Sequence, residues 1–119
     1  MEEYEHVMFI QRLKPDKKEE YIKAHQEIWP DLLKAHKEAG IAREIIWIFG
    51  DYLILYIMST NFKEAMNNLS ETKIFKEWIN YMSQLLDEIQ DYSLGKTNII
   101  TLEKVFDLEK QLEDLEKSN

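Results

Sequence analysis

The sequence predicts an α+β fold in which a four-stranded antiparallel sheet carries its helices on one face. Stretches rich in β-branched and aromatic residues alternate with stretches of helical periodicity, in the order strand, helix, strand, strand, helix, strand (βαββαβ). The two central strands are separated only by Gly50-Asp51, a two-residue hairpin signal that makes them antiparallel neighbours.

Length and composition limit the classes of function. The 119 residues suit a single domain, which we assign to residues 1–106, followed by a charged tail over 107–119. A formal net charge of −8 argues against nucleic acid or an anionic membrane surface as a partner. Because we find neither a signal peptide pattern nor an apolar run long enough to span a bilayer, we expect a cytoplasmic protein. The absence of cysteine excludes disulfides and thiolate chemistry.

The first strand is expected over residues 5–13, with Val7, Phe9 and Gln11 on one face. A helix should then run over 15–39, interrupted at Pro30, because proline lacks an N–H and its ring crowds the preceding turn. We expect a kink there, or a second segment with Pro30 in its first turn. Gly40 supplies the stop.

Strands are expected over residues 41–49 and 52–59. Asn61 should cap a short helix that ends near residue 69, and Ser70 should cap the next helix, which reaches about residue 89. Residues 91–96 are typical of a loop, and 98–106 of a last strand. The tail has leucines at helical spacing, so it is either frayed or a small helix that docks on a neighbour; these leucines are Leu108, Leu112 and Leu115.

The central strands carry large apolar residues on both faces. We place Ile41, Ile45, Trp47 and Phe49 on one face of the first of them, opposite Ile46 and Ile48. Helices can cover only one face of the sheet, and exposing the other would leave a large apolar patch. The sequence therefore predicts a homodimer whose sheets pack face to face.

One helical arc combines a titratable imidazole with apolar and aromatic side chains. At 100° per residue, His25 lies near the centre of that arc. The arc comprises Tyr21, Ile22, His25, Ile28, Trp29, Leu32, Leu33 and His36. A histidine at such a place is either a hydrogen-bonded packing residue or a proton carrier, and the pattern alone leaves both open.

Metal and nucleotide sites are not expected. His25 and His36 are eleven residues apart, which is about 16 Å along one helix axis and too far to share a zinc ion. Three glycines in the whole chain do not make a phosphate-binding loop.

The remaining candidates are aromatic and polar: Tyr21, His25, Trp78, Tyr81, Glu44, Trp47, Tyr56 and Arg12. Tyr21 and His25, one turn apart, can point into one pocket. Aromatic walls with a few hydrogen-bonding groups suit a neutral sugar ring. Singly, each also has a structural explanation: Arg12 and Glu44 can pair with each other or with solvent. Four aromatic residues are more typical of a core, namely Trp29, Trp47, Phe75 and Tyr81.

The sequence resembles the L-rhamnose mutarotase family up to about residue 106. The resemblance rests on Tyr21-x-x-x-His25-x-x-Ile28-Trp29-Pro30, on Gly40, on the strand pair around Gly50-Asp51, and on Trp78-x-x-Tyr81-Met82. It implies a dimeric α+β barrel of ferredoxin-like subunits, and an isomerase that interconverts the α and β anomers of a sugar without cofactor or metal.

The resemblance also implies roles for single residues. His25 would be the proton donor, Tyr21 would contact the sugar, and Trp78 would stack on it. Two positions depart from the family: Glu44 replaces a tyrosine, and Ile79 replaces the second tryptophan of a pair. The expected substrate is therefore L-rhamnose or another deoxysugar, such as L-fucose. If Glu44 faces the pocket, it could accept hydrogen bonds from the sugar or act as a second proton carrier.

Two other classes of function stay open at this point. Dimeric α+β barrels also include cofactor-free oxygenases of aromatic substrates, because a fold alone does not fix a reaction. A non-catalytic dimeric ligand-binding module is the third hypothesis, and it would be favoured if Tyr21 and His25 had no cavity beside them.

Overall fold

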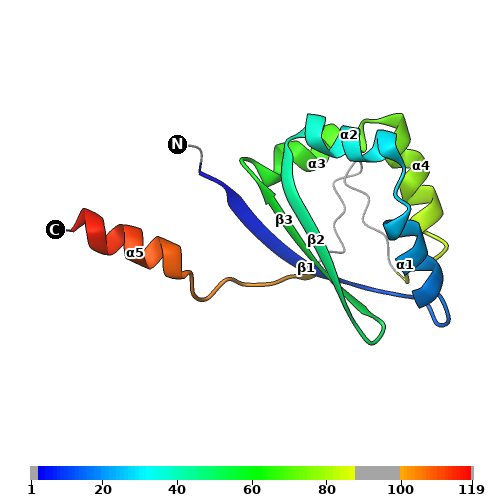
Figure 1. Cartoon of the computed structure of the whole chain (residues 1–119), viewed down its shortest axis with the longest axis horizontal. Helices are drawn as coiled ribbons and strands as arrows, with labels where there is room; N and C mark the ends of the chain where they lie inside the picture. Colours follow the sequence, from blue (N-terminus) through cyan, green and yellow to red (C-terminus); the bar gives the residue numbers. More distant parts are fainter. Residues whose placement is uncertain (1–2, 88–99, 119) are drawn as a thin grey trace.

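The computed structural model describes residues 3–87 and 100–118. Its elements follow the predicted order: β1 (Glu5–Arg12), α1 (Lys18–Gln26), α2 (Pro30–Ala39), β2 (Ile41–Phe49), β3 (Tyr52–Ser59), α3 (Phe62–Ser70), α4 (Lys73–Met82), β4 (Ile100–Thr101) and α5 (Leu108–Lys117). Helices α1 to α4 lie on one side of a sheet, and α5 lies apart at the end of an extended segment (Figure 1).

The sheet has the strand order β2-β3-β1-β4, and all three pairings are antiparallel. This is the α+β arrangement of a ferredoxin-like fold. The prediction of a fourth full strand over 98–106 was wrong, because only Ile100 and Thr101 pair with β1 as a strand. Leu102 donates one more bond to the Met8 carbonyl at 2.8 Å, and the side chain of Val105 is 87 % exposed. A high β propensity means that a residue fits a half-buried pleated surface. Residues 103–106 are exposed and have no such surface to pack on in this chain.

The predicted interruption at Pro30 is confirmed in its second form. α1 ends at Gln26, the chain becomes extended at Trp29, and α2 begins at Pro30 in the first helical position. Proline at that position loses no intrahelical bond, and its fixed φ suits a helix start. α2 ends at Gly40, as predicted, with a φ of 110° in the left-handed region.

The break also changes which side chains face the core. The single helical arc predicted Leu33 to be inward, but Leu33 is exposed whereas Leu32 is buried. An arc computed on one continuous helix fails here, because the residues between α1 and α2 do not keep the phase of the first segment.

The β2–β3 hairpin forms with the predicted bounds. Its pairing shifts register between Ile41 and Arg43, where a β-bulge inserts Ala42. A bulge moves the preceding residue to the other face of a strand. Ile41 is therefore buried on the helix side, and its predicted place beside Trp47 was wrong. Glu44 lies on the helix side as well, since it lines a cavity there.

The predicted cap of α3 is confirmed, whereas the predicted cap of α4 is wrong. The Asn61 side chain accepts from the Glu64 N–H at 3.0 Å, as predicted for the start of α3. Ser70 does not cap α4: it is the last residue of α3, and its hydroxyl donates to the Asn67 carbonyl at 2.8 Å. Thr72 caps α4 instead. The prediction that this helix reaches about residue 89 was wrong, because α4 ends at Met82 and residues 83–87 are not helical. The predicted loop over 91–96 lies outside the described residues.

The core fills the space between the helices and the inner face of the sheet. Sheet residues Phe9, Leu55 and Ile57 are buried against Leu32 and Leu69 of the helices. The opposite face of the sheet is different: Trp47 is 50 % exposed and Phe49 76 %. The prediction that Trp47 belongs to the core was therefore wrong for the single chain.

The tail forms the helix α5, and its docking on a neighbour stays a prediction. Its N-cap is Asp107, whose carboxylate accepts from the Lys110 N–H at 3.0 Å and contacts the Lys104 ammonium at 3.0 Å. The three leucines of α5 are exposed. No helix among residues 3–87 and 100–118 is long and apolar enough to cross a membrane.

Candidate active site

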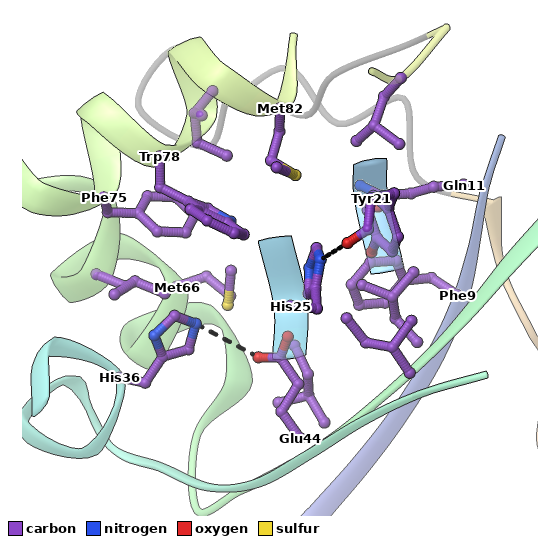
Figure 2. Close-up of a pocket in the computed structure, with 16 residues that line it drawn as sticks. Phe9, Gln11, Tyr21, His25, His36, Glu44, Met66, Phe75, Trp78 and Met82 are labelled. Carbon is purple, nitrogen blue, oxygen red and sulfur yellow. Dashed lines mark hydrogen bonds and ion pairs between the residues drawn. The ribbon is translucent and has the colours of Figure 1, made fainter. Parts of the chain in front are cut away.

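A cavity of about 80 Å³ opens between the inner face of the sheet and helices α1 to α4. Its polar wall consists of Gln11, Tyr21, His25, His36 and Glu44, and most of the remaining lining is apolar or aromatic. Figure 2 shows His25 and Glu44 projecting into the same space from α1 and β2. A more open hollow of about 270 Å³ shares Tyr21, His25 and Ile46 with this cavity. His25 therefore lies where the hollow and the inner cavity meet.

The orientation of His25 is fixed by its own helix. Its Nδ1 lies 2.8 Å from the carbonyl oxygen of Tyr21, one turn earlier. A carbonyl oxygen can only accept, so Nδ1 carries the proton and donates it. Burial lowers the pKa of His25, and the bond to Tyr21 offsets this only in part. The neutral ring therefore has an unprotonated Nε2, which can act as a base.

Tyr21 and Trp78 enclose the imidazole. The Tyr21 ring centroid lies 3.9 Å from that of His25, and the Trp78 ring meets the imidazole edge-on at 5.1 Å. Tyr21 is only 3 % exposed. Burial, with a smaller contribution from the charge of Glu44, raises the pKa of its phenol. Tyr21 thus stays protonated near neutral pH and can donate a hydrogen bond.

Trp78 is anchored by other aromatic rings. Trp29 packs edge-on against it at 5.1 Å, and Tyr81 does so at 5.8 Å. Trp78 is 6 % exposed and lines the cavity, so one side chain serves both the core and the pocket wall. Ile79, the residue at the second departure from the family pattern, lines the cavity as well.

Glu44 has a partner, His36, that the sequence does not predict. Its Oε1 lies 3.6 Å from Nε2 of His36, whose Nδ1 lies 2.7 Å from the Leu32 carbonyl. Burial raises the pKa of Glu44, and the nearby His36 opposes this only partly. The Glu44 side chain keeps a quarter of its surface accessible.

Two lining residues were missed from the sequence, His36 and Gln11. His36 lies on the predicted arc of His25, but a continuous helix would hold the two imidazoles far apart, so the sequence predicts no shared site for them. The break before Pro30 lets both line one cavity. Gln11 was expected on the face of Phe9, which is where it lies, and only its role was overlooked.

Other candidates lie elsewhere. Arg12 is exposed and pairs with Asp87 at 3.7 Å, so its suggested pairing with Glu44 was wrong. Trp47 and Tyr56 belong to the outer face of the sheet, where the Tyr56 hydroxyl lies 2.6 Å from Nδ1 of His6. Tyr81 supports Trp78 and Trp29. Within the part of the chain that the structure describes, no three His, Cys, Asp or Glu side chains are grouped so as to hold a metal ion.

Comparison with known proteins places this chain in a family. The sequence profile described as L-rhamnose mutarotase matches residues 6–108. The chain belongs to the L-rhamnose mutarotase family. Members are isomerases that act on the anomeric carbon of a sugar, and the chain is an enzyme of this kind.

Individual relatives in the L-rhamnose mutarotase family agree with this assignment. An L-rhamnose mutarotase from Burkholderia ambifaria is 32 % identical over 88 % of this chain and 99 % of its own. Another from Clostridium beijerinckii is 37 % identical over 71 % of this chain and 83 % of its own.

Solved structures agree in fold. A crystal structure of an L-rhamnose mutarotase from Formosa agariphila matches with a TM-score of 0.69 and 23 % identity, covering 87 % of this chain and 97 % of the other. A putative antibiotic biosynthesis monooxygenase from Bordetella bronchiseptica matches at 0.63 with 11 % identity, covering 87 % and 98 %. Both likenesses concern the fold alone.

Proposed function

We propose that this enzyme interconverts the α and β anomers of L-rhamnose or a related deoxysugar such as L-fucose, with His25 as the general acid and base. The observation that carries the proposal is the position of His25 at the junction of cavity and hollow, with its Nδ1 held by the Tyr21 carbonyl. An imidazole held in this way presents Nε2 to whatever occupies the cavity.

The reaction needs two proton movements. A proton leaves the anomeric hydroxyl while another reaches the ring oxygen; the ring opens to an aldehyde, turns about one bond and closes again with these roles reversed. A group that titrates near the working pH can both take and return a proton, and such groups typically contribute about 10²–10⁴-fold. Imidazole is the side chain best suited to this.

The other lining residues match a deoxysugar in shape and polarity. Trp78 would stack on the C–H face of the ring, and Tyr21 would donate to a hydroxyl. Glu44 would accept hydrogen bonds from further hydroxyls. The apolar lining, which includes Leu55, Met66 and Met82, would receive the methyl group that a 6-deoxysugar has in place of a hydroxymethyl group.

Saturation-transfer NMR on matched sugars tests the substrate class. L-rhamnose and L-mannose differ only in the oxygen on C6, and so do L-fucose and L-galactose. An unpaired hydroxyl in an apolar pocket costs about 1–3 kcal/mol. We therefore expect enzyme-dependent anomer exchange to be at least about fivefold faster for the deoxysugar of at least one pair. Exchange that never exceeds the spontaneous rate would contradict the proposed function, and equal rates within both pairs would contradict the role of the apolar lining.

We also propose that the enzyme is a homodimer in which the outer faces of the two sheets meet. No helix among the described residues covers this face (Figure 1), and it carries Trp47, Phe49 and Tyr52, all largely exposed. Aromatic residues at this density are typical of protein interfaces. The exposed leucines of α5 provide further apolar surface for a partner subunit.

Replacing Trp47 with glutamate should break this dimer, because two like charges would be placed in a desolvated interface. Sedimentation equilibrium should give twice the chain mass of 14.3 kDa for the wild type and 14.3 kDa for Trp47→Glu. Lys63→Glu, an exposed change on α3, serves as the control and should leave the mass at the dimer value. A wild-type protein that sediments as a single chain would contradict the proposed assembly.

A further inference from the structure

The two histidines at the cavity are held in the same way. Each donates its Nδ1 proton to the carbonyl four residues earlier, His25 to Tyr21 at 2.8 Å and His36 to Leu32 at 2.7 Å. In both rings the remaining nitrogen, Nε2, is left to the surroundings. For His36 that nitrogen faces a carboxyl group, Oε1 of Glu44, at 3.6 Å (Figure 2).

The contact between His36 and Glu44 favours one shared proton on the two facing atoms. A bare Nε2 and a bare carboxylate oxygen are both acceptors, so they repel each other unless one proton lies on either of them. The pair then holds that proton as a carboxylic acid beside a neutral ring, or as a carboxylate beside an imidazolium. Both states carry no net charge, which is the inexpensive state for a buried pair. The pair can therefore hold one transferable proton on this side of the cavity.

We propose that Glu44 is the second catalytic proton carrier of the reaction and that His36 is its positioning residue. The inference rests on the proposed function, in which His25 supplies the first proton-transfer group. Both carboxyl and imidazole line the cavity. Among the described residues that line it, the titratable side chains besides these two are Tyr21 and His25, both from α1.

The two groups have complementary states at the start of the reaction. Neutral His25 has a free Nε2 and no proton to give from it, because its one proton is bound to the Tyr21 carbonyl. Glu44, whose pKa is raised by burial, can retain a proton, and in the pair with His36 that proton can lie on either partner. A pocket that contains one base and one acid satisfies the requirement of ring opening without bulk water.

The proton movements balance. Nε2 of His25 removes the proton of the anomeric hydroxyl, and the electrons of that O–H bond form the C=O bond of the aldehyde. The bond between the anomeric carbon and the ring oxygen breaks, and its electron pair takes up the proton from Glu44. After rotation about the adjacent C–C bond, Glu44 takes that proton back as the ring closes, and His25 returns its proton to the carbonyl oxygen. Neither group changes its charge over the cycle.

Glu44→Gln tests the proposal with a variant of nearly the same shape. The amide cannot supply the proton, so the exchange rate, after subtraction of the spontaneous rate, should fall at least about a hundredfold. The wild-type rate should have a bell-shaped dependence on pH: the acid limb reports protonation of His25 and the alkaline limb reports loss of the stored proton. In Glu44→Gln the alkaline limb should disappear while the acid limb remains.

His36→Gln tests the positioning role. Two sites that share one proton hold it more tightly than either site alone, and the amide of glutamine also stabilises the carboxylate of Glu44. The alkaline limb should therefore move to lower pH, with a smaller loss of rate at its optimum than in Glu44→Gln. A purely structural role for His36 would change the rate at all pH values and leave the limb where it is.

Glu38→Gln is the matched control, because it makes the same chemical change on an exposed residue of α2. It should keep the wild-type rate and both limbs. If the Glu44→Gln enzyme kept the wild-type rate, or if its alkaline limb did not move, the proposed role of Glu44 as the second proton carrier would be wrong. Failure of the proposed function is a separate result: the wild-type protein itself would then give no exchange above the spontaneous rate.

Discussion

His25→Ala is expected to remove most of the rate enhancement of anomer exchange, about 10²–10⁴-fold, while the protein stays folded. The imidazole lies between the Tyr21 and Trp78 rings, and no other side chain described in the cavity has a nitrogen base at that junction. Exchange NMR measures the rate, and circular dichroism confirms the fold. Lys23→Ala, an exposed change on the same helix, should leave the rate unaltered.

The pH dependence of stability provides an independent check on His25. Because burial lowers its pKa, the unfolded chain binds this proton more readily than the folded one below the ordinary imidazole value of about 6.5. Stability should therefore fall as the pH drops below that value, until the folded pKa is reached. Urea unfolding between pH 7.5 and 5 should show a shallower decline in His25→Ala than in the wild type. Full exchange activity in His25→Ala would contradict its role, whatever the stability.

Trp78→Ala should have the largest effect on stability, lowering the free energy of unfolding by about 3–5 kcal/mol. The indole is almost completely buried and packs against Trp29, Tyr81 and His25. Its removal would leave a void that the neighbouring rings cannot fill and would open one wall of the pocket. Urea unfolding measures the loss of stability.

The same substitution separates packing from substrate contact. Trp78→Phe keeps a flat ring and should recover part of the stability and of the sugar affinity, measured as KM, whereas Glu77→Ala on the exposed side of α4 should change neither. If Trp78→Ala lowered stability but left KM unchanged, the indole would be a core residue only.

Most of the fold could be predicted from local signals. The hairpin at Gly50-Asp51, the stop at Gly40 and the helix start at Pro30 all depend on the conformational limits of one or two residues, and all three are confirmed. The fourth strand was predicted from composition, which does not report whether a neighbouring strand continues to pair. Ser70 and Thr72 are equally good caps in sequence, and only the true end of α3 distinguishes them.

The candidate site was predictable where its residues are local. Tyr21 and His25 lie one helical turn apart, so their contact follows from helix geometry. The bulge in β2 decides which residues of that strand share a face, and the sequence predicts an unbroken strand there. The pairing of Glu44 with His36 depends on both the bulge and the break between helices, so it could not be derived from spacing.

The interruption between α1 and α2 has a consequence for how the chemistry of such a pocket can diversify. In an unbroken helix, residues 25 and 36 would lie about 16 Å apart along the axis, and each would belong to a different neighbourhood. The break before Pro30 turns a span of twelve residues into a compact unit whose two imidazoles line one cavity. Substitutions on α2 and β2 can then alter one wall of the cavity while α1 and its histidine stay as they are. The polar lining of the cavity can change in this way without rebuilding the helix that holds His25.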